Sequence, residues 1–589
     1  MYRTHTCGEL TASDKGKTVT LSGWVHRRRD HGGVIFIDLR DRYGLTQVVF
    51  DPEFDKKSWE AAEKIRPEFV LKVTGGVRNR IKGQENRNMK TGDIEVYINQ
   101  IEILNESKTP PFEIDQEKPV GEELRLKYRY LDLRHDRMRD NLVLRHKMIK
   151  EIRDFLDKDG FVEVETPILI KGTPEGSREY LVPSRLYPGK FFVLPQSPQQ
   201  LKQLLMIAGM DKYFQIARCF RDEDQRGDRQ PEFTQLDLEM SFAEEKDVMA
   251  INEKLFINLT RKFAPTKQIK ENPFPIFTWH EAMNRFGSDK PDLRFNMELT
   301  DVSDVVEKSD FKVFSGTVEA GGVVKALKVK GVADWSRSEL DKLEELAKVY
   351  GAKGLAYLVY KKEGIKSPIL KFLSDEIAEG VTKATGAKTG DIVFFAADQF
   401  TTACDVLGQV RLYCGEKLGL MDPNVFSYCW VNEFPLFEFE KETGQLAAMH
   451  HPFTRPMDED RELLERDPVK ARAIAYDIIL NGNEIGGGSI RIHEHKLQQQ
   501  IFEILKISPQ DAEARFGHIL EAFRYGAPPH GGIAWGLDRL IMLFADEPNI
   551  REVIAFPKDQ KAKDLTLGAP SEMPEKDIKE ANIQILHKK

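Results

Sequence analysis

The first hundred residues alternate between apolar and polar positions in short runs, a pattern that is typical of β-strands. Five runs separated by Gly, Asp and Asn are expected to form strands, at 18–25, 34–39, 46–50, 69–73 and 94–98. Five short strands suit a closed Greek-key barrel, the OB-fold, which commonly binds oligonucleotides. The proline-containing, charged stretch 108–120 is expected to link this barrel to the rest of the chain.

A helical pattern follows, in which apolar residues recur every three or four positions: Met148, Ile149, Ile152, Phe155 and Leu156. Gly160 is placed to end this helix, and a strand at 161–166 is expected to stop at Pro167. On its own, this unit indicates no more than an amphipathic helix beside a core strand.

The pattern changes again between 288 and 422. Strand-like apolar runs at 351–360 and 390–398 alternate with helical stretches such as 336–351, which predicts an inserted α+β module. Strands are expected to resume near Tyr428 and Gly486.

The composition sets limits on the class of protein. With 589 residues the chain is too long for one hydrophobic core, so several domains are expected. The net charge of -8 argues against a protein that coats nucleic acid, although local basic patches could still bind RNA. The five cysteines include no C-x-x-C pair, so we expect a reducing, cytoplasmic location, no disulfide framework and no zinc site. Neither a signal peptide nor a membrane segment is expected.

Two charged segments suggest chemistry. In 214–240, two strand-like runs flank Arg221-Asp222-Glu223 and a polar loop that carries Arg226 and Arg229. An arginine so placed can clamp a phosphate with its rigid fork of donors, although a solvated hairpin with surface salt bridges is an equal alternative.

In the second segment, 531–543, glycines precede a short strand, and Gly536 opens a helix that carries Asp538 and Arg539. A helix start favours anions, but a salt bridge at the helix start would give the same pattern.

The helix–strand unit that ends at Pro167 and these two charged segments resemble, in this order, the three signature motifs of class II aminoacyl-tRNA synthetases (class IIb). The strings between them resemble the bacterial aspartyl-tRNA synthetases. The matching strings are GWVHRRRD at 23–30, TPEGSREYLVPSR at 173–185, LPQSPQQLKQLLM at 194–206, RDEDQRGDRQPEFTQLD at 221–237, MHHPFT at 449–454 and NEIGGGSIRIH at 483–493. The resemblance covers essentially the whole chain.

The resemblance implies an α+β multidomain protein with an OB-fold barrel, an antiparallel-sheet catalytic core and an inserted, GAD-like α+β module. The implied divisions are an anticodon-binding barrel at 1–107, a hinge at 108–135, the first part of the core at 136–287, the inserted module at 288–422, the second part of the core at 423–560 and a C-terminal extension at 561–589. Dimerisation through the segment that ends at Pro167 would make the protein a homodimer.

For ATP, the resemblance implies that Arg221 binds the α-phosphate, Phe233 lies under the adenine ring and Arg539 binds the γ-phosphate. Arg221, Glu223 and Arg539 would be the catalytic residues. The other implied ATP-site residues are Asp222, Gln230, Glu484, Gly536, Leu537 and Asp538. Glu484 and Asp477 would hold Mg²⁺, because carboxylates together with substrate phosphates are its usual ligands.

For L-aspartate, the resemblance implies that Arg491 and Lys202 hold the side-chain carboxylate. The other implied aspartate-site residues are Glu175, Ser197, Gln199, Arg221, Asp237 and His450, the last on a closing loop. Asparagine would leave two cations facing a neutral amide, so we expect the site to reject asparagine in favour of aspartate without an editing domain.

For tRNA-Asp, the resemblance implies that Arg27, Arg28 and Arg29 supply charge for phosphates, that Phe36 stacks on a base and that Gln47 reads a base edge. His31 and Gly83 resemble instead the non-discriminating branch of the family, which also charges tRNA-Asn.

Two alternatives stay open. A catalytically dead, RNA-binding paralogue is disfavoured by the intact Arg221, Glu223, Glu484, Arg491 and Arg539. A sister enzyme specific for asparagine or lysine is disfavoured by the inserted module and by the QSPQQLKQ string at 196–203.

Overall fold

The computed structural model describes residues 1–114, 119–172, 177–223, 229–440 and 444–586. The chain divides into two compact units: the first is Met1–Val143 with Arg551–Ser571, and the second is Leu144–Ile550 with Glu572–Lys589. None of the helices in the described ranges is long and apolar enough to cross a membrane.

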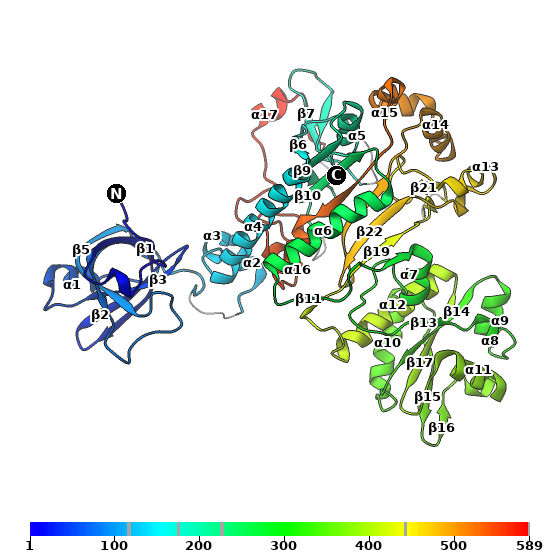
Figure 1. Ribbon diagram of the computed structural model, residues 1–589, viewed down its shortest axis with the longest axis horizontal. Coiled ribbons are helices and arrows are strands. Elements are labelled where there is room, and N and C mark those ends of the chain that lie inside the picture. Colours follow the sequence, from blue (N-terminus) through cyan, green and yellow to red (C-terminus); the bar gives the residue numbers. More distant parts are fainter. Residues whose placement is uncertain (115–118, 173–176, 224–228, 441–443, 587–589) are drawn as a thin grey trace. The chain divides into compact units, whose positions relative to one another are not determined.

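The N-terminal strands close into a barrel in the order β1-β2-β3-β5-β4, as the alternating pattern predicted (Figure 1). Each strand extends beyond its apolar run at one end at least, because polar residues continue the backbone pairing after the core is filled. Alternate residues such as Ile35, Ile37 and Leu39 are fully buried in this core. The elements are β1 (Thr18–His31), β2 (Val34–Asp41), β3 (Gly44–Phe50), α1 (Lys56–Ala62), β4 (Val70–Asn79) and β5 (Ile94–Asn105).

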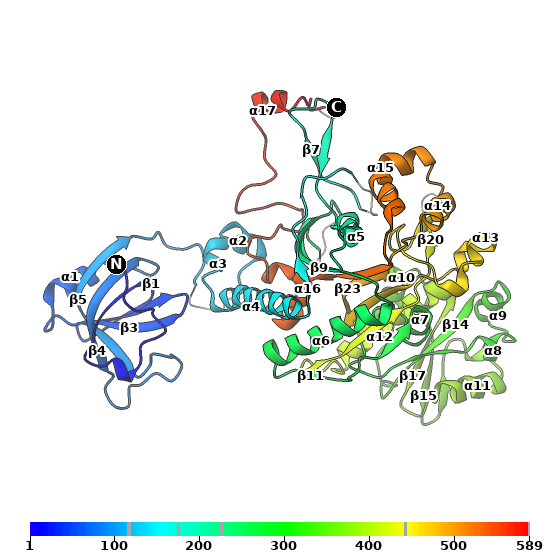
Figure 2. The same cartoon turned by 45° about the horizontal axis from the view of Figure 1, so that its top comes forward.

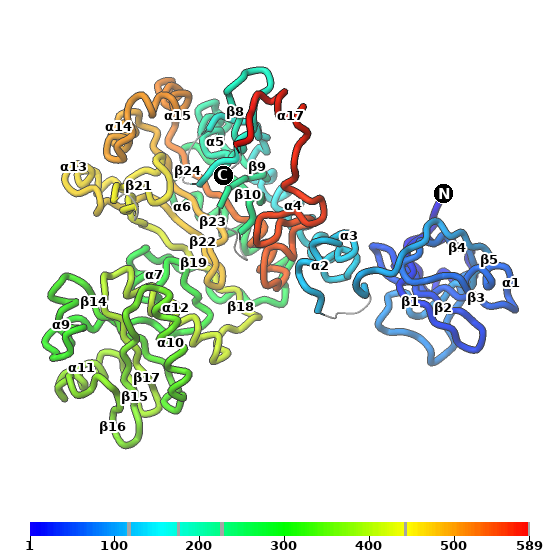
Figure 3. Tube along the Cα trace, turned by 180° about the vertical axis from the view of Figure 1, so that it is seen from behind, coloured from blue at the N-terminus to red at the C-terminus, as the bar shows by residue number. Residues whose placement is uncertain are grey.

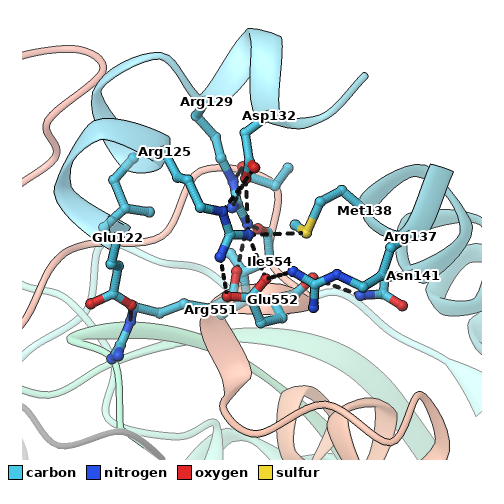
Figure 4. Close-up of polar contacts among 12 residues, drawn as sticks. Glu122, Arg125, Arg129, Asp132, Arg137, Met138, Asn141, Arg551, Glu552 and Ile554 are labelled. Atoms are coloured by element: carbon cyan, nitrogen blue, oxygen red, sulfur yellow. Dashed lines mark hydrogen bonds and ion pairs between the residues drawn. The ribbon is translucent and has the colours of Figure 1, made fainter. Parts of the chain in front are cut away.

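Two short helices after the barrel, α2 (Glu122–Lys127) and α3 (Arg129–Asp132), pack on the segment that starts at Arg551 (Figure 4). The Arg125 guanidinium binds the carboxylate of Glu552 at 2.9 and 2.6 Å and that of Asp132 at 2.9 Å. Arg129 is fully buried and donates to three main-chain carbonyls of residues 551–555. This polar cluster joins parts of the chain that are more than four hundred residues apart.

The second unit is built on an eight-stranded sheet of order β12-β19-β22-β23-β24-β10-β9-β6. Its central pairs are antiparallel, as expected, and β6 and β12 add parallel edges. Helix α6 packs on the sheet (Figure 2). The Phe256 ring of this helix stacks on the Trp535 ring of β24, with 3.9 Å between the ring centres. The predicted strand at 161–166 is shorter than expected, because β6 pairs with β9 at Val162 and Glu163 alone.

The elements of the sheet and its surroundings are α4 (Asp136–Lys158), β6 (Val162–Glu163), β7 (Leu181–Pro183), β8 (Phe191–Val193), α5 (Gln199–Ile207), β9 (Lys212–Phe220), β10 (Glu232–Ser241), α6 (Glu245–Phe263), β11 (Gln268–Ile269), β12 (Ile276–Thr278), α7 (Trp279–Phe286), β18 (Val425–Phe426), β19 (Tyr428–Asn432), β20 (Phe437–Phe439), β21 (Leu446–Ala448), α13 (Leu463–Arg466), β22 (Ala475–Leu480), β23 (Asn483–Ile490), α14 (His495–Ile504), α15 (Pro509–Ala522), β24 (His530–Gly536), α16 (Leu537–Phe544) and α17 (Glu575–Glu580). In α4, the predicted apolar face is buried at Met148, Ile152 and Leu156.

The chain leaves the sheet after α7, forms an α+β module and returns through β18 (Figure 3). The module is an antiparallel sheet of order β13-β14-β17-β15-β16 with helices on both faces. Leu327 and Val329 of β14 face α10 and α12, whereas Val324 and Ala326 face α8, α9 and α11. Its elements are β13 (Leu299–Asp301), α8 (Ser303–Val306), α9 (Lys312–Glu319), β14 (Val323–Val329), α10 (Arg337–Val349), β15 (Ala356–Lys361), β16 (Gly364–Lys366), α11 (Asp375–Thr385), β17 (Ile392–Asp398) and α12 (Phe400–Lys417).

Candidate active site

A buried cluster of four charges lies where α5 and β10 meet the residue that follows β23, Arg491. Glu239 of β10 accepts hydrogen bonds from Arg491 Nε at 2.9 Å and from Arg491 Nη2 at 3.2 Å. Lys202 Nζ lies 3.1 Å from Asp237 Oδ1 and 3.3 Å from Glu239 Oε2. All four side chains are at most 3% exposed.

This cluster gives the two predicted cations a counter-charge. Lys202 and Arg491, which the resemblance assigns to a side-chain carboxylate of the ligand, both contact the carboxylate of Glu239. The physical reason is desolvation: two buried cations side by side would be very costly without a counter-charge. Asp237, expected beside an amino group, also contacts Lys202.

A glycine makes room for the shared carboxylate. Gly532 of β24 is opposite Glu239 of β10 in the antiparallel register. A Cβ atom at Gly532 would lie 2.0 Å from the Leu238 carbonyl oxygen and 2.2 Å from Glu239 Oε2. The Gly531-Gly532 pair in the sequence is therefore a packing requirement of this site.

The charges in the cluster shift one another's pKa. Burial would raise the pKa of the Glu239 carboxyl, but Arg491 and Lys202 lower that pKa below its usual range. At Asp237, burial raises the pKa by more than Lys202 lowers it. Burial would lower the pKa of Arg491, but Glu239 raises it, so this guanidinium stays charged.

A cavity of about 300 Å³ opens along β10, β23 and the start of α16. The residues predicted for ATP that line it are Arg221, Glu223, Gln230, Phe233, Glu484, Gly536, Asp538 and Arg539. The Arg221 guanidinium carbon lies 5.2 Å from the centre of the Phe233 ring, and its buried Nε has no hydrogen-bond partner among the described residues. Arg539 donates to the main-chain carbonyl of Glu484. The cavity thus combines an aromatic surface with arginines, a combination suited to a nucleotide.

Three residues predicted for ATP are not free to bind it or do not line the cavity. Asp538 lines the cavity, but both its carboxylate oxygens already accept hydrogen bonds, one from Arg145 and the other from the main-chain N–H of Thr234 at 2.8 Å. Leu537 is fully buried and Asp222 is exposed, and neither is among the residues that line the cavity.

A second cavity, of about 400 Å³, adjoins the first and shares Arg221 and Glu484 with it. The residues predicted for aspartate that line it are Ser197, Gln199, Lys202, Arg221, Asp237, His450 and Arg491. Burial lowers the pKa of His450 to about 4, so its ring is neutral near pH 7.

The predicted metal ligands Asp477 and Glu484 both line the second cavity, and Glu484 also lines the first. Burial and the neighbouring Glu484 raise the pKa of Asp477 well above its ordinary value. No hydrogen-bond donor among the described residues reaches Asp477 Oδ1, and His450 Nε2 is 3.9 Å away. Two neighbouring carboxylates, one of them with an oxygen that no described donor reaches, fit a hard divalent cation such as Mg²⁺. A group of three or more His, Cys, Asp or Glu side chains that could hold a metal is absent from the described part of the chain.

Sequence reasoning missed three residues of this site. Glu239 follows Asp237 by two positions, so strand periodicity placed both on one face and could have identified it. His451 Nε2 lies 2.9 Å from Arg491 Nη1, and Lys290 Nζ lies 3.0 Å from Glu484 Oε2. No pattern in the sequence marks Lys290. Of the positions predicted from the sequence, Glu175 and Arg226 lie outside the described residues.

In the barrel, Arg29 is paired with both oxygens of Asp38 at 2.7 and 2.8 Å. Gln47 is buried, accepts from Arg29 at 3.3 Å and donates to Glu95 at 2.8 Å. Phe36 is partly exposed. Arg27 is exposed, and Arg28 Nε lies 3.4 Å from the Ala62 carbonyl oxygen. The centres of the His31 and Phe36 rings are 6.2 Å apart, and Gly83 has a φ of +90°.

Comparison with known proteins settles the family. A family model described as tRNA synthetases class II (D, K and N) matches residues 121–560, and one described as an OB-fold nucleic acid binding domain matches residues 19–104. The chain belongs to the class II tRNA synthetases.

Relatives of this class II synthetase match it from end to end. A protein of Rubrobacter xylanophilus named aspartate–tRNA(Asp/Asn) ligase is 54% identical, over 99% of this chain and 97% of the relative. A protein of Halothermothrix orenii with the same name is 53% identical, over 99% of both chains.

Solved structures agree with the fold of this synthetase. The asparaginyl-tRNA synthetase of Pyrococcus horikoshii, complexed with asparaginyl-adenylate, superposes with a TM-score of 0.60 at 20% identity, covering 95% of this chain and 98% of that chain. The aspartyl-tRNA synthetase of Entamoeba histolytica gives 0.56 at 19% identity, covering 94% and 90%. At this identity the likeness concerns the fold alone.

Proposed function

We propose that the protein activates L-aspartate with ATP and transfers it to tRNA-Asp. The observation that carries this proposal is the buried Arg491, held by Glu239 at the end of a cavity that adjoins the nucleotide-like cavity. A guanidinium in this position matches a side-chain carboxylate better than an amide or an ammonium. The names of the relatives from Rubrobacter xylanophilus and Halothermothrix orenii agree with aspartate.

In the first step, an oxygen of the aspartate α-carboxylate attacks the α-phosphorus of ATP. The bond from that phosphorus to the bridging oxygen breaks, and pyrophosphate leaves with the electron pair. Arg221 neutralises charge on the α-phosphate, Arg539 holds the far end of the phosphate chain, and Phe233 supports the adenine ring. Glu223 accepts from Arg229 at 2.7 Å and would lie beside the adenine amino group, and Gln230 lines the same cavity. Positioning and charge neutralisation supply most of the rate enhancement in phosphoryl chemistry of this kind.

Asp477 and Glu484 would hold Mg²⁺. When bound there, the ion would neutralise phosphate charge and help to orient the phosphate chain. Around it, Gln199, Ser197 and Asp237 would position the amino acid, His450 would cover it, and Glu175 belongs to the same proposed set.

In the second step, a terminal ribose hydroxyl of tRNA attacks the carbonyl of aspartyl-adenylate, the ester forms and AMP leaves. The barrel would hold the anticodon through Arg27, Arg29, Phe36 and Gln47. Because Arg29 and Gln47 are already joined to Asp38 and Glu95, they would present a fixed polar surface to a base.

The test is pyrophosphate exchange with aspartate, asparagine or lysine as the amino acid. Exchange that depends on aspartate supports the proposal, whereas exchange with asparagine or lysine would assign a sister specificity. Arg491→Leu should abolish aspartate activation while the far-ultraviolet circular dichroism is unchanged. Retained activity in that variant would show that the carboxylate pocket is elsewhere.

A second candidate function is aspartylation of tRNA-Asn as well. It is favoured by the relatives named aspartate–tRNA(Asp/Asn) ligase and by His31 with Gly83. Charging purified tRNA-Asp and tRNA-Asn side by side decides between the two. Comparable charging of both would require a downstream amidation of the aspartyl group on tRNA-Asn, and charging of tRNA-Asp alone would reject the dual function.

We also propose a homodimer. Exposed apolar side chains gather on the segment after Pro167: Ile168, Leu169, Leu181, Leu186, Tyr187, Phe191 and Phe192. A patch of this kind marks an interface. Sedimentation velocity should show a dimer that Leu181→Glu with Phe191→Glu dissociates. Val349→Glu, at an exposed apolar residue of α10, is the control, and an unchanged sedimentation coefficient in the double variant would refute the assignment.

The six-part domain division and the cytoplasmic location stay predictions.

A further inference from the structure

Lys290 lies on the segment that leads from α7 into the inserted module, and it lines both cavities of the site. Its Nζ is 3.0 Å from Glu484 Oε2, and both side chains are partly exposed to the cavity. A partly exposed ion pair adds little to stability. The position of this pair, at the junction of the two cavities, therefore calls for a functional explanation.

Lys290 lies among groups that line the cavities. Asp289 lines the second cavity beside it, and its ammonium contacts the carboxylate of Glu484. This cation stands in the same cavity wall as Arg221 and Arg539.

The inserted module fixes the segment that carries Lys290. Arg411 of α12, at the far end of the module in sequence, donates to the main-chain carbonyls of Met297 at 2.7 Å, Asp292 at 2.9 Å and Phe295 at 3.1 Å. Its guanidinium carbon lies 4.2 Å from the centre of the Phe295 ring, and the side chain is 1% exposed. One buried side chain therefore determines the backbone path of residues 292–297.

The module is also packed closely on α7, which ends just before this segment. A Cβ atom at Gly408 of α12 would lie 2.0 Å from the Gly287 carbonyl oxygen, so the two backbones are in direct contact. Lys325 of β14 is completely buried and reaches Asn284 of α7 as well as Asp301. Contacts with the module therefore fix the segment 288–298 at both of its ends.

We propose that Lys290 binds the phosphate chain of the nucleoside triphosphate, and that the inserted module serves this site by holding Lys290 in place through Arg411. Without nucleotide the ammonium rests on Glu484, and with nucleotide it contacts phosphate oxygens in the cavity that it shares with Arg221 and Arg539. The proposal rests on the proposed ATP-dependent function.

The first test measures equilibrium binding of a non-hydrolysable ATP analogue by calorimetry, in the absence of amino acid. Lys290→Met should weaken binding about 10- to 100-fold, the range for one lost hydrogen bond between charged groups. Lys290→Arg should restore part of the affinity. Lys308→Met, at an exposed lysine of the module, is the control. Binding by Lys290→Met equal to that of the Lys308→Met control would overturn the proposal.

The second test separates positioning from folding. Arg411→Met should weaken the analogue although the residue is not in the cavity, and combining it with Lys290→Met should add no further loss. Additive losses would show that Arg411 acts independently of Lys290. If Arg411→Met does not fold, Arg411→Lys with the same readout replaces it.

Steady-state exchange kinetics keep the two proposals apart. In Lys290→Met the KM for ATP should rise while the KM for aspartate stays near the wild-type value. If wild-type protein binds the analogue and Lys290→Met does not, but exchange requires another amino acid, the inference on Lys290 stands and aspartate specificity fails.

Discussion

Replacing Glu239 by Gln keeps the shape of the side chain and removes the negative charge that Lys202 and Arg491 share. Both cations are nearly inaccessible to water, so solvent cannot replace the lost charge. Loss of one member of a buried ion pair costs about 3–5 kcal/mol. Asp237 still contacts Lys202, so we expect the lower end, about 3 kcal/mol.

That free energy corresponds to roughly a hundredfold change in the unfolding equilibrium, at about 1.4 kcal/mol for each factor of ten. The assay is urea unfolding followed by the fluorescence of tryptophans, which include Trp430 and Trp535 in the sheet beside the cluster. Glu298→Gln is the matched control, because Glu298 forms an exposed pair with Arg285 that contributes about 0–1 kcal/mol.

The pH dependence supplies a second signature. The pKa of Glu239 is lower in the folded protein than its ordinary value of 4.5, so its contribution is present above that pH and is lost as the pH falls through the folded pKa. The stability difference between wild type and Glu239→Gln should therefore shrink in acid. A loss at neutral pH no larger than that of the Glu298→Gln control would refute the reasoning.

Three further predictions follow from other parts of the structure. Phe36→Ala should remove a base-stacking surface worth about 1–3 kcal/mol and raise the KM for tRNA, while pyrophosphate exchange without tRNA stays unchanged; an unchanged KM would remove Phe36 from the anticodon site. Burial lowers the pKa of His530 below 6.5, so protonation favours the unfolded state and stability should fall as the pH drops from 6.5. Thermal melts of His530→Gln should show a weaker fall, and equal slopes would contradict this. Gly532→Ala should cost about 1–3 kcal/mol in urea unfolding by overpacking against Leu238, and a neutral effect would show that β10 and β24 can separate.

The sequence predicted those elements whose cause is local. Apolar alternation predicted the five barrel strands, because their buried faces repeat every second residue. The pair β9 and β10 was predicted from two β-like runs around a charged loop. The strand expected to end at Pro167 was too long, because strand length depends on the partner available for pairing, and β9 pairs with two residues of β6.

The site was less accessible to such reasoning. Resemblance indicated Arg491 and Lys202, but their common counter-ion depends on strands that are brought together from distant parts of the chain. The counter-charge of the two cations was therefore not predicted, although the resemblance indicated both cations. Lys290 lies in an irregular segment, where no periodicity indicates which way a side chain points.

The cluster of Arg125, Arg129 and Glu552 has a consequence for how the protein is made. Arg125 and Glu552 are 427 residues apart, so at about 5–20 residues per second a ribosome needs about 20 to 85 s between them. The barrel strands are contiguous and can fold as soon as they emerge. Helices α2 and α3 cannot complete their packing until nearly the whole chain has been made. Until then Arg125 and Arg129 lack the partners in residues 551–555 that bury them. A nascent-chain chaperone would therefore protect this protein most before Glu552 appears.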